Sequence, residues 1–314
     1  MEKMLSSLKI EKLRGDADIN KGCVVAVGNF DGVHMGHRAL IERLVSESVN
    51  YGVPSAVFTF FEEDRPKMDV KMLSQYGSKS FLLSGMFVDL LISAPFGSFR
   101  DMEAEEFIES FLMGFLNVKC VICGYDFRFG RGRKGDAELI KKLLSPYGVR
   151  VISADALVDG DAPISSTVIR TLISEGDVEK ANVMLGRPFS FKAPVSFGAQ
   201  IGRTLGFPTA NQKYPSELVT PAFGVYAVWC LLDGEVYGGV ANFGVKPTVG
   251  GVSEPICETY IFDFDGDCYG KEMTIAFRSF IRKERRFSSL GELKAQIELD
   301  KKEAERIYKE GVNI

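Results

Sequence analysis

Residues 23–37 read CVVAVGNFDGVHMGH. The apolar, β-branched run at 23–28 predicts a strand that is buried on both faces of a parallel sheet. After the glycines, apolar residues recur at helical spacing, which predicts a helix that begins near Gly36. A buried strand, a glycine-rich turn and a helix together form the repeating unit of doubly wound α/β sheets. We therefore expect the amino-terminal half of the chain to have that fold.

The only two histidines of the chain, His34 and His37, lie in this turn. They would stand at the carboxyl end of the strand and the amino end of the helix, where N–H groups and the helix dipole attract anions. The glycines would let the backbone approach a phosphate closely. We therefore expect a nucleotide phosphate site. The alternatives are a solvated cap or core histidines, and a zinc site, which would need more ligands than two histidines at i and i+3.

Composition places further bounds on the chain. Its 314 residues are 46% apolar and 25% charged, which is typical of soluble globular proteins. No transmembrane run or signal peptide is visible, so we expect a cytoplasmic protein without a membrane role. The net charge of −4 favours small phosphorylated ligands over nucleic acid, and nothing indicates an obligate protein partner. The six cysteines lie mostly in strand-like runs, and we expect them to be reduced and structural.

The texture of the chain changes near Leu185-Gly186-Arg187-Pro188, which predicts domains at 1–188 and 189–314. The first domain is predicted to have strands at 23–28, 54–60, 88–93, 118–123 and 149–154, with helices at 37–50, 77–86, 103–116, 135–146, 166–175 and 177–185. The second has short β-rich runs, which predict an antiparallel barrel or sandwich. A helix from 288 to about 309 would close it, with a buried stripe formed by Leu290, Leu293, Ile297, Ala304 and Ile307.

The turn at Gly28–His37 resembles the HxGH signature of the nucleotidyltransferase superfamily, and in full it is similar to the bacterial bifunctional riboflavin kinase/FAD synthetase family. Two later segments agree with this resemblance, Gly124-Tyr125-Asp126-Phe127-Arg128-Phe129-Gly130 and Ile164-Ser165-Ser166-Thr167-Val168-Ile169-Arg170. Both follow predicted strands, so in a parallel sheet they would gather with the histidines at one edge. The residues at 165–167 would otherwise be an ordinary helix cap.

The resemblance implies that an FMN phosphate oxygen attacks the α-phosphorus of ATP and pyrophosphate leaves, with Mg²⁺ present. Positioning and charge neutralisation carry such a reaction, without a protein nucleophile. The catalytic residues implied are His34, His37 and Arg170. The residues implied to bind ATP are Gly28, Asn29, Phe30, Asp31, Gly36, Gly124, Asp126, Ser165, Ser166 and Thr167.

The first domain departs from the family pattern at two places. The family commonly has Thr-Phe-x-Pro-His-Pro after the second strand, whereas this chain has Thr59-Phe60-Phe61-Glu62-Glu63-Asp64-Arg65-Pro66, which is acidic and lacks the histidine. The arginine that often precedes Ile169 is Val168 here. These differences bear on flavin binding or on the rate of adenylylation.

The second domain contains Gly202-Arg203-Thr204-Leu205-Gly206-Phe207-Pro208-Thr209-Ala210-Asn211, which resembles the Gly-Phe-Pro-Thr-Ala-Asn motif of riboflavin kinase. The Thr209 hydroxyl and the Asn211 carbonyl are hard oxygen ligands that suit Mg²⁺. The resemblance implies that Glu258 is a general base on the riboflavin 5′-hydroxyl; residue type and spacing alone do not separate it from Glu254. Also implied at the ATP and flavin site are Gly202, Gly206, Pro208, Gly224, Tyr226, Asn242, Gly244, Arg285 and Phe287. The family often has a histidine near Gly198, where this chain has Phe197, and a changed nucleotide contact is expected.

The resemblance spans roughly residues 20 to 300 and implies two successive activities. The second domain would convert riboflavin and ATP to FMN, and the first would convert FMN and ATP to FAD. Two other hypotheses stay open. One is a riboflavin kinase whose first domain has lost adenylylation, motivated by the acidic segment at 62–64. The other is a non-catalytic flavin or nucleotide sensor.

Overall fold

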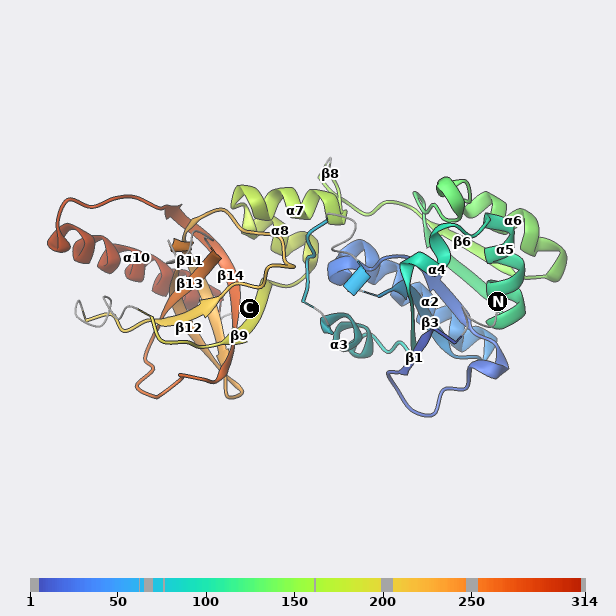
Figure 1. Cartoon of the computed structure of the whole chain (residues 1–314), viewed down its shortest axis with the longest axis horizontal. Coiled ribbons are helices and arrows are strands. Elements are labelled where there is room, and N and C mark those ends of the chain that lie inside the picture. The colour runs from blue at the N-terminus through green and yellow to red at the C-terminus, as the bar shows by residue number, and fades with distance from the viewer. Residues whose placement is uncertain are drawn as a thin grey trace. The chain divides into compact units, whose positions relative to one another are not determined.

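The computed structural model describes residues 6–61, 63–64, 70–75, 77–160, 162–198, 206–246 and 254–311. The chain forms two compact units, residues 1–71 with 76–165, and residues 72–75 with 166–314. Figure 1 shows the sheet of the first unit in blue to green and that of the second in yellow to red. The predicted combination of an α/β part and an all-β part with a carboxyl-terminal helix is confirmed.

The first unit is built on a sheet with the strand order β1-β4-β3-β2-β5-β6. All neighbours from β4 to β6 are parallel, and only the edge strand β1 runs antiparallel. The strands are β1 (Lys9–Lys12), β2 (Val24–Val27), β3 (Ser55–Phe60), β4 (Leu90–Ala94), β5 (Cys120–Gly124) and β6 (Arg150–Ala154). The chain reverses its direction of winding between β2 and β5, which is where ligands bind in open α/β sheets.

Helices cover both faces of this sheet. On one face, α2 (Met35–Tyr51) and α3 (Ser78–Gly85) bury Ile41, Leu44 and Leu83 against the strands. On the other, a π-helix at Phe107–Phe115 and helix α6 (Ala137–Leu144) bury a phenylalanine-rich cluster. The predicted helix at 103–116 is divided between the single turn α5 (Ala104–Glu106) and this wider helix. The helix α4 (Phe96–Arg100), the turns Ile19–Lys21, Asp31–Val33, Arg131–Arg133 and Ser145–Tyr147, and the hairpin of β7 (Val158–Asp159) and β8 (Ala162–Pro163) complete the unit.

The second unit begins with two helices, α7 (Ser166–Glu175) and α8 (Val178–Leu185), at the predicted positions. Asn182 ties α8 to the barrel, since its Nδ2 donates to the Phe277 carbonyl at 2.8 Å and its Oδ1 accepts from the Phe189 amide at 2.7 Å. The border between the compact units at 165/166 therefore differs from the predicted domain border at 188/189. As a division of function between the two reactions, the border at 188/189 stays a prediction.

The second sheet is antiparallel throughout, with the strand order β10-β13-β12-β11-β14-β9. A bridge between Ser196 and Asn211 joins the ends of the first and last strands, so the sheet curls into a barrel. Tyr226, Phe243 and Phe277 are buried on its inner face. The strands are β9 (Phe189–Pro194), β10 (Ala210–Lys213), β11 (Gly224–Leu232), β12 (Glu235–Lys246), β13 (Glu254–Ile261) and β14 (Glu272–Lys283).

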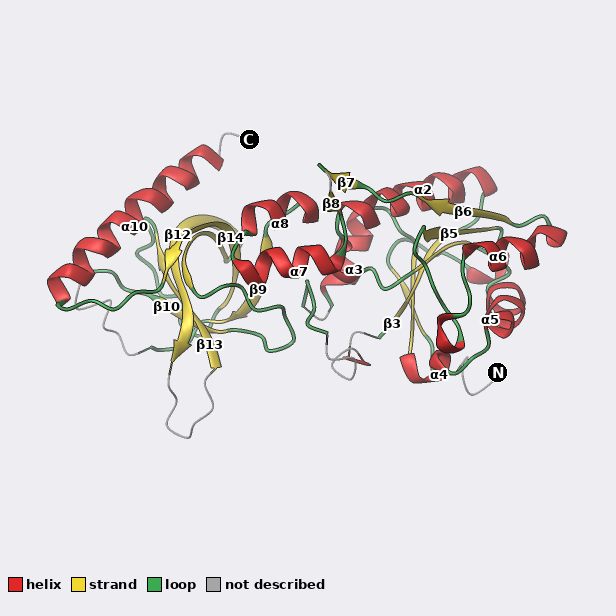
Figure 2. Ribbon diagram, turned by 90° about the horizontal axis from the view of Figure 1, so that it is seen from above, coloured by secondary structure: helices red, strands yellow, loops and turns green. Residues whose placement is uncertain are grey.

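Helix α10 (Leu290–Gly311) packs on the outer face of this sheet, as Figure 2 shows. Ala304 and Ile307 contact Val225, Val240 and Phe262, as the predicted stripe requires. Leu290 is 65% exposed, so this part of the predicted stripe is wrong. The helix begins there with a capping turn, in which Ser289 Oγ accepts from the Glu292 amide at 3.2 Å. In the described ranges, no helix is both long and apolar enough to cross a lipid bilayer.

All six cysteines are free and buried, as predicted. Cys120 and Cys123 belong to the cores on opposite faces of the first sheet, so this pair forms no joint site. Burial raises the pKa of the Cys23 and Cys257 thiols to about 12, and that of Cys120 and Cys123 to about 11. The more reactive thiolate form is therefore scarce at pH 8.

Thiol modification by 5,5′-dithiobis(2-nitrobenzoate) at pH 8 is expected to be slow in the native protein. A pKa raised by two units lowers the thiolate fraction by about 100-fold, so Cys23, Cys120, Cys123 and Cys257 should react more slowly by at least that factor than in the unfolded chain. All six equivalents should react after addition of guanidinium chloride. Rapid reaction of Cys23, Cys120 or Cys257 in the folded protein would contradict the structure.

Two candidate nucleotide sites

The first candidate site is the turn that joins β2 to α2. The Gly28 amide donates to the Phe58 carbonyl at 3.2 Å, which ends the pairing of β2 with β3. Beyond it, Phe30 and Val33 have positive φ angles of 48° and 41°. Positive φ is strained for residues with a side chain, above all for β-branched valine, and such strain clusters at functional sites. The turn is therefore held in one unusual conformation at the point where the sheet changes its winding direction.

The two histidines lie face to face at the amino end of α2. Their ring centroids are 3.6 Å apart, with an interplanar angle of 19°. His34 caps the helix, because its Nδ1 accepts from the His37 amide at 3.3 Å. With Nδ1 used as an acceptor, a neutral His34 ring carries its proton on Nε2 and can donate from there. Both rings therefore belong to one helix terminus, where negative charge is stabilised.

Other predicted residues of the first site lie around this turn. Asp31 is buried, and Phe30 is 1% exposed with its ring 5.1 Å from that of His37, so Phe30 supports the histidine from the core. A Cβ placed on Gly36 would lie 3.2 Å from the His34 ring and 3.3 Å from the Ile164 carbonyl oxygen. The segment that leads to Ser165 therefore reaches the same helix terminus, as predicted.

The segment after β5 stands at the other side of the switch point. Gly124 is the last residue of β5, and a Cβ there would meet Asp126 Oδ1 at 3.3 Å. Asp126 is exposed. The adjacent Phe127 and Phe129 rings stack at 5.4 Å, and Gly135 fits against Phe129 where a Cβ would collide. Gly124 and Asp126 thus come to the predicted edge of the sheet.

Three of the predicted residues belong to the second compact unit. Ser166, Thr167 and Arg170 lie in the first turns of α7, directly after Ser165. Thr167 is exposed, whereas Ser166 and Arg170 are half-buried. Arg170 and the histidine pair belong to different compact units. The role of Arg170 at the phosphates therefore stays a prediction.

Lys79 is a residue of this site that the sequence analysis missed. It is the second residue of α3 and is 3% exposed. Its Nζ donates to the Asn29 carbonyl at 3.0 Å and to Thr59 Oγ1 at 3.3 Å, and the Thr59 hydroxyl donates to the same carbonyl at 3.1 Å. A lysine followed by an apolar helix, next to a glycine-rich turn in space, has no signature in sequence.

The acidic segment that replaces the family's Pro-His-Pro is described only in part, because Glu62 lies outside the described residues. Asp64 Oδ2 accepts from the Phe96 amide at 2.8 Å, at the beginning of α4. One acid of this segment therefore has a structural role at a helix amino terminus.

The second candidate site is a row of polar side chains across three strands of the barrel. Asn211 of β10 pairs with Glu258 of β13, and Glu258 pairs on its other side with Asn242 of β12. Directly paired residues point to the same face of a sheet. This is the face on which α10 packs, because Val240, two residues before Asn242, contacts Ala304. The row thus combines one carboxylate with two amides beside α10.

The structure separates the two glutamates that sequence alone could not. Glu254 forms an exposed ion pair with Lys213, with 2.7 Å between Oε2 and Nζ. Glu258 is half-buried and lies between the two asparagines. Of the two glutamates, only Glu258 lies in the polar row.

Asn211 contacts residues just before β10 and residues just after β9. Its side chain is 5% exposed, and its Nδ2 donates to Thr209 Oγ1 at 3.4 Å. Its backbone carbonyl accepts from the Ser196 amide at 2.7 Å, and a Cβ on Gly198 would lie 2.5 Å from the Asn211 amide group. Thr209 and Asn211 therefore lie in contact. A hydroxyl and an amide carbonyl are donor types that Mg²⁺ accepts, and their role as its ligands stays a prediction.

The remaining predicted residues of this site have diverse positions. Gly206 has a φ of +90°, and Pro208 is exposed; Gly202 lies outside the described residues. A Cβ on Gly224 would collide with the Arg282 carbonyl. Tyr226 is fully buried, and its hydroxyl donates to the Ala222 carbonyl, so its side chain lies in the barrel core and not at the ligand surface where it was predicted.

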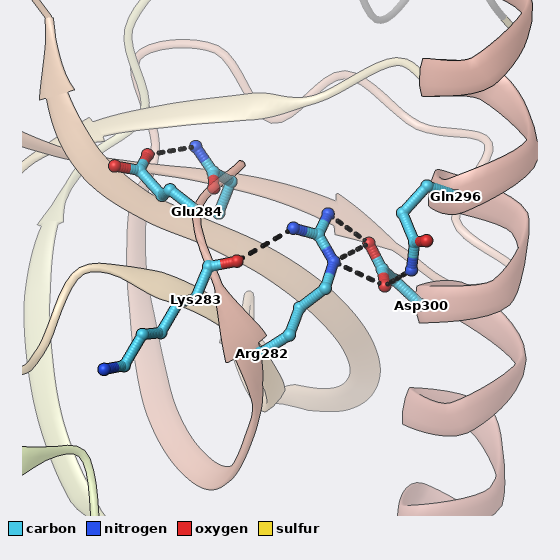
Figure 3. A network of polar contacts seen from close by, with 6 residues as sticks. Arg282, Lys283, Glu284, Gln296 and Asp300 are labelled. Carbon is cyan, nitrogen blue, oxygen red and sulfur yellow. Dashed lines mark hydrogen bonds and ion pairs between the residues drawn. The ribbon is translucent and has the colours of Figure 1, made fainter. Parts of the chain in front are cut away.

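The carboxyl end of β14 is linked to α10 by a largely buried ion pair, as Figure 3 shows. Arg282 Nη2 and Nε donate to the Asp300 carboxylate at 2.7 and 2.9 Å, and Gln296 donates to the same carboxylate at 2.7 Å. Glu284 Oε1 accepts from Asn242 Nδ2 at 3.4 Å and covers Gly244. The ordered β14 end therefore lies beside the polar row.

Two aromatic groups complete the surroundings. The Arg285 guanidinium lies 4.6 Å from the centre of the Phe287 ring, a cation–π contact. Phe197, which stands where the family often has histidine, is 71% exposed and stacks on Tyr269 at 4.0 Å. Within the described ranges, no three His, Cys, Asp or Glu side chains are arranged to bind a metal ion, so they contain no zinc site of this kind.

The chain thus combines a parallel α/β unit that has paired histidines at its switch point with a barrel that has a carboxylate between two amides, and each part has one candidate nucleotide site. Family models agree, with FAD synthetase matching residues 16–168 and riboflavin kinase matching residues 185–308. The chain belongs to the bifunctional riboflavin kinase/FMN adenylyltransferase family.

Relatives support this assignment over nearly the whole length, and a solved structure shares the fold over a similar length. The bifunctional enzyme of Escherichia coli K12 is 38% identical over 297 residues, 92% of this chain and 93% of the relative. That of Bacillus subtilis is 36% identical and covers 91% of this chain and 92% of the relative. The crystal structure of a macrolide-efflux protein from Streptococcus pneumoniae has a TM-score of 0.82 at 30% identity, covering 91% of this chain and 93% of that one.

Proposed function

We propose that the protein makes FMN from riboflavin and ATP in its barrel, and FAD from FMN and ATP in its α/β unit. The observation that carries the proposal is the presence of two distinct polar clusters, the stacked histidine pair at the amino end of α2 and Glu258 between two asparagines of the barrel. Family membership supplies the substrates: riboflavin, FMN and ATP.

In the kinase reaction, the riboflavin 5′-hydroxyl attacks the γ-phosphorus of ATP and ADP leaves. Glu258 accepts the hydroxyl proton, and Asn211 and Asn242, which flank it on the neighbouring strands, orient the reactants. Mg²⁺ neutralises phosphate charge when bound, and Thr209 and Asn211 offer the oxygen donors that would hold it. Glu258 is half-buried and lies in the polar row, a position that supports its role as the proton acceptor.

In the adenylyl transfer, a phosphate oxygen of FMN attacks the α-phosphorus of ATP, and pyrophosphate leaves. His34 and His37 donate to phosphate oxygens, and the amino terminus of α2 stabilises the negative charge that builds up. The glycines at 28 and 36 admit the nucleotide, and Ser165, Ser166, Thr167 and Arg170 complete the phosphate contacts. Gly124 and Asp126 face the adenosine.

One assay tests both activities. The purified protein is incubated with riboflavin, ATP and Mg²⁺, and in a second reaction with FMN, ATP and Mg²⁺, and the flavins are separated by chromatography. We expect FMN and FAD in the first reaction and FAD in the second. FMN without FAD would instead support a kinase with an inactive first unit, to which the acidic segment at 62–64 would point. Flavin binding without any turnover would support a sensor. The cytoplasmic location stays a prediction.

A further inference from the structure

We propose that Lys79 is a positioning residue of the adenylyl transfer site, whose buried ammonium fixes the turn at Gly28–His37 for the nucleotide phosphates. This inference rests on the proposed function of the α/β unit. It adds a residue from α3 to a site otherwise built from the segments after β2, β5 and β6.

The position of Lys79 is energetically unfavourable for a charged side chain. Lys79 as a whole is 3% exposed, and desolvation of a charged group destabilises the folded state. It also stands in the first turn of α3, where the helix dipole disfavours positive charge. A position that is unfavourable in both respects calls for a compensating role.

The Lys79 ammonium anchors the backbone carbonyl of Asn29. Lys79 Nζ and the Thr59 hydroxyl both donate to the Asn29 carbonyl, at 3.0 and 3.1 Å. These contacts link the first turn of α3 and the carboxyl end of β3 to the turn after β2. In a planar trans peptide, the carbonyl and the N–H of the next residue point in opposite directions. Anchoring the Asn29 carbonyl therefore aims the Phe30 N–H away from Lys79.

The turn at Gly28–His37 is strained at the residue that follows this carbonyl. Phe30 has a φ of 48°, a left-handed conformation that is uncommon and strained for a residue with a side chain. The anchored carbonyl immediately before Phe30 supports this conformation. The Phe30 ring in turn lies 5.1 Å from the His37 ring. Lys79 thus acts on the histidine pair through the backbone, and its charge makes the potential at this edge more positive.

The test compares Lys79→Met with the unaltered protein at a temperature at which circular dichroism shows both to be folded. Because hydrogen bonds from a charged group and preorganised donors both contribute to catalysis, kcat for FAD formation should fall by about 10- to 100-fold. The KM for FMN should change less than about twofold, since the turn acts on the reacting phosphates, and riboflavin phosphorylation should be unchanged. Lys9→Met, an exposed lysine of the same unit, is the matched control.

Thr59→Val provides a second, smaller perturbation of the same anchor. It should also lower kcat for FAD formation, by a smaller factor. In the double variant with Lys79→Met, kcat should fall by less than the product of the two single factors. Thr59→Val on its own tests the same anchor in the case in which Lys79→Met does not fold. If folded Lys79→Met forms FAD at the normal rate, or if Lys79→Met does not fold and Thr59→Val forms FAD at the normal rate, Lys79 has no positioning role. If the unaltered protein forms no FAD, the proposed function itself fails, and this inference fails with it.

Discussion

Replacement of Glu258 by glutamine is expected to lower riboflavin phosphorylation by about 10²- to 10⁴-fold, the usual contribution of a general base. Glutamine keeps the shape and the hydrogen-bonding oxygen of the side chain but does not accept the proton of the 5′-hydroxyl. FAD formation from supplied FMN should continue at the normal rate, because Glu258 lies in the barrel and not in the α/β unit. Flavin chromatography measures both rates in the same preparation.

Glu254→Gln is the matched control, because Glu254 lies on the same strand, four residues earlier, and on the same face. Its carboxylate forms an exposed ion pair with Lys213, a kind of contact that contributes little to stability. Both rates should therefore be normal in this variant. Loss of phosphorylation in Glu254→Gln, or its retention in Glu258→Gln, would place the base elsewhere. Loss of both activities in folded Glu258→Gln would contradict two independent sites.

Local patterns in the sequence were sufficient to predict the α/β unit. The run at 23–28 and the periodic residues after Gly36 predicted β2 and α2 almost to the residue, because a buried strand and an amphipathic helix follow from neighbouring side chains. The wide helix at 107–115 was beyond such a prediction, since its apolar pattern is that of any helix. Leu290 was wrongly placed in the core because helical spacing does not show where the sheet beneath a helix ends.

The positions of several site residues depend on contacts between distant parts of the chain, which local sequence patterns do not record. The choice of Glu258 over Glu254 came from the resemblance, and in the structure it depends on strand register, a long-range property. The burial of Lys79 depends on the approach of α3 to β3, which no local pattern records. The resemblance assigns Tyr226 to the ligand site, but its side chain packs in the barrel core. A sequence motif includes residues that support a site as well as residues that contact the ligand.

Loss of the His37 ring is expected to lower FAD formation by about 10²- to 10³-fold, as for a donor that stabilises charge developing in the transition state. In His37→Ala the backbone amide that His34 caps is still present, so α2 should keep its amino terminus. Riboflavin phosphorylation by the same preparation should be unchanged and reports that the barrel is native.

His34 needs a different substitution because it has two roles, as helix cap and as phosphate donor. Asparagine is also a favourable N-cap, whereas alanine at this position loses about 1 kcal/mol of stability. His34→Asn should therefore keep the melting temperature of the native protein and lose FAD formation to a similar extent as His37→Ala, while His34→Ala should lose both. If His34→Asn forms FAD at the normal rate, the ring serves only as a cap. If His37→Ala also does so, the stacked pair takes no part in adenylyl transfer, and the phosphate site must be sought among the other segments at this edge of the sheet.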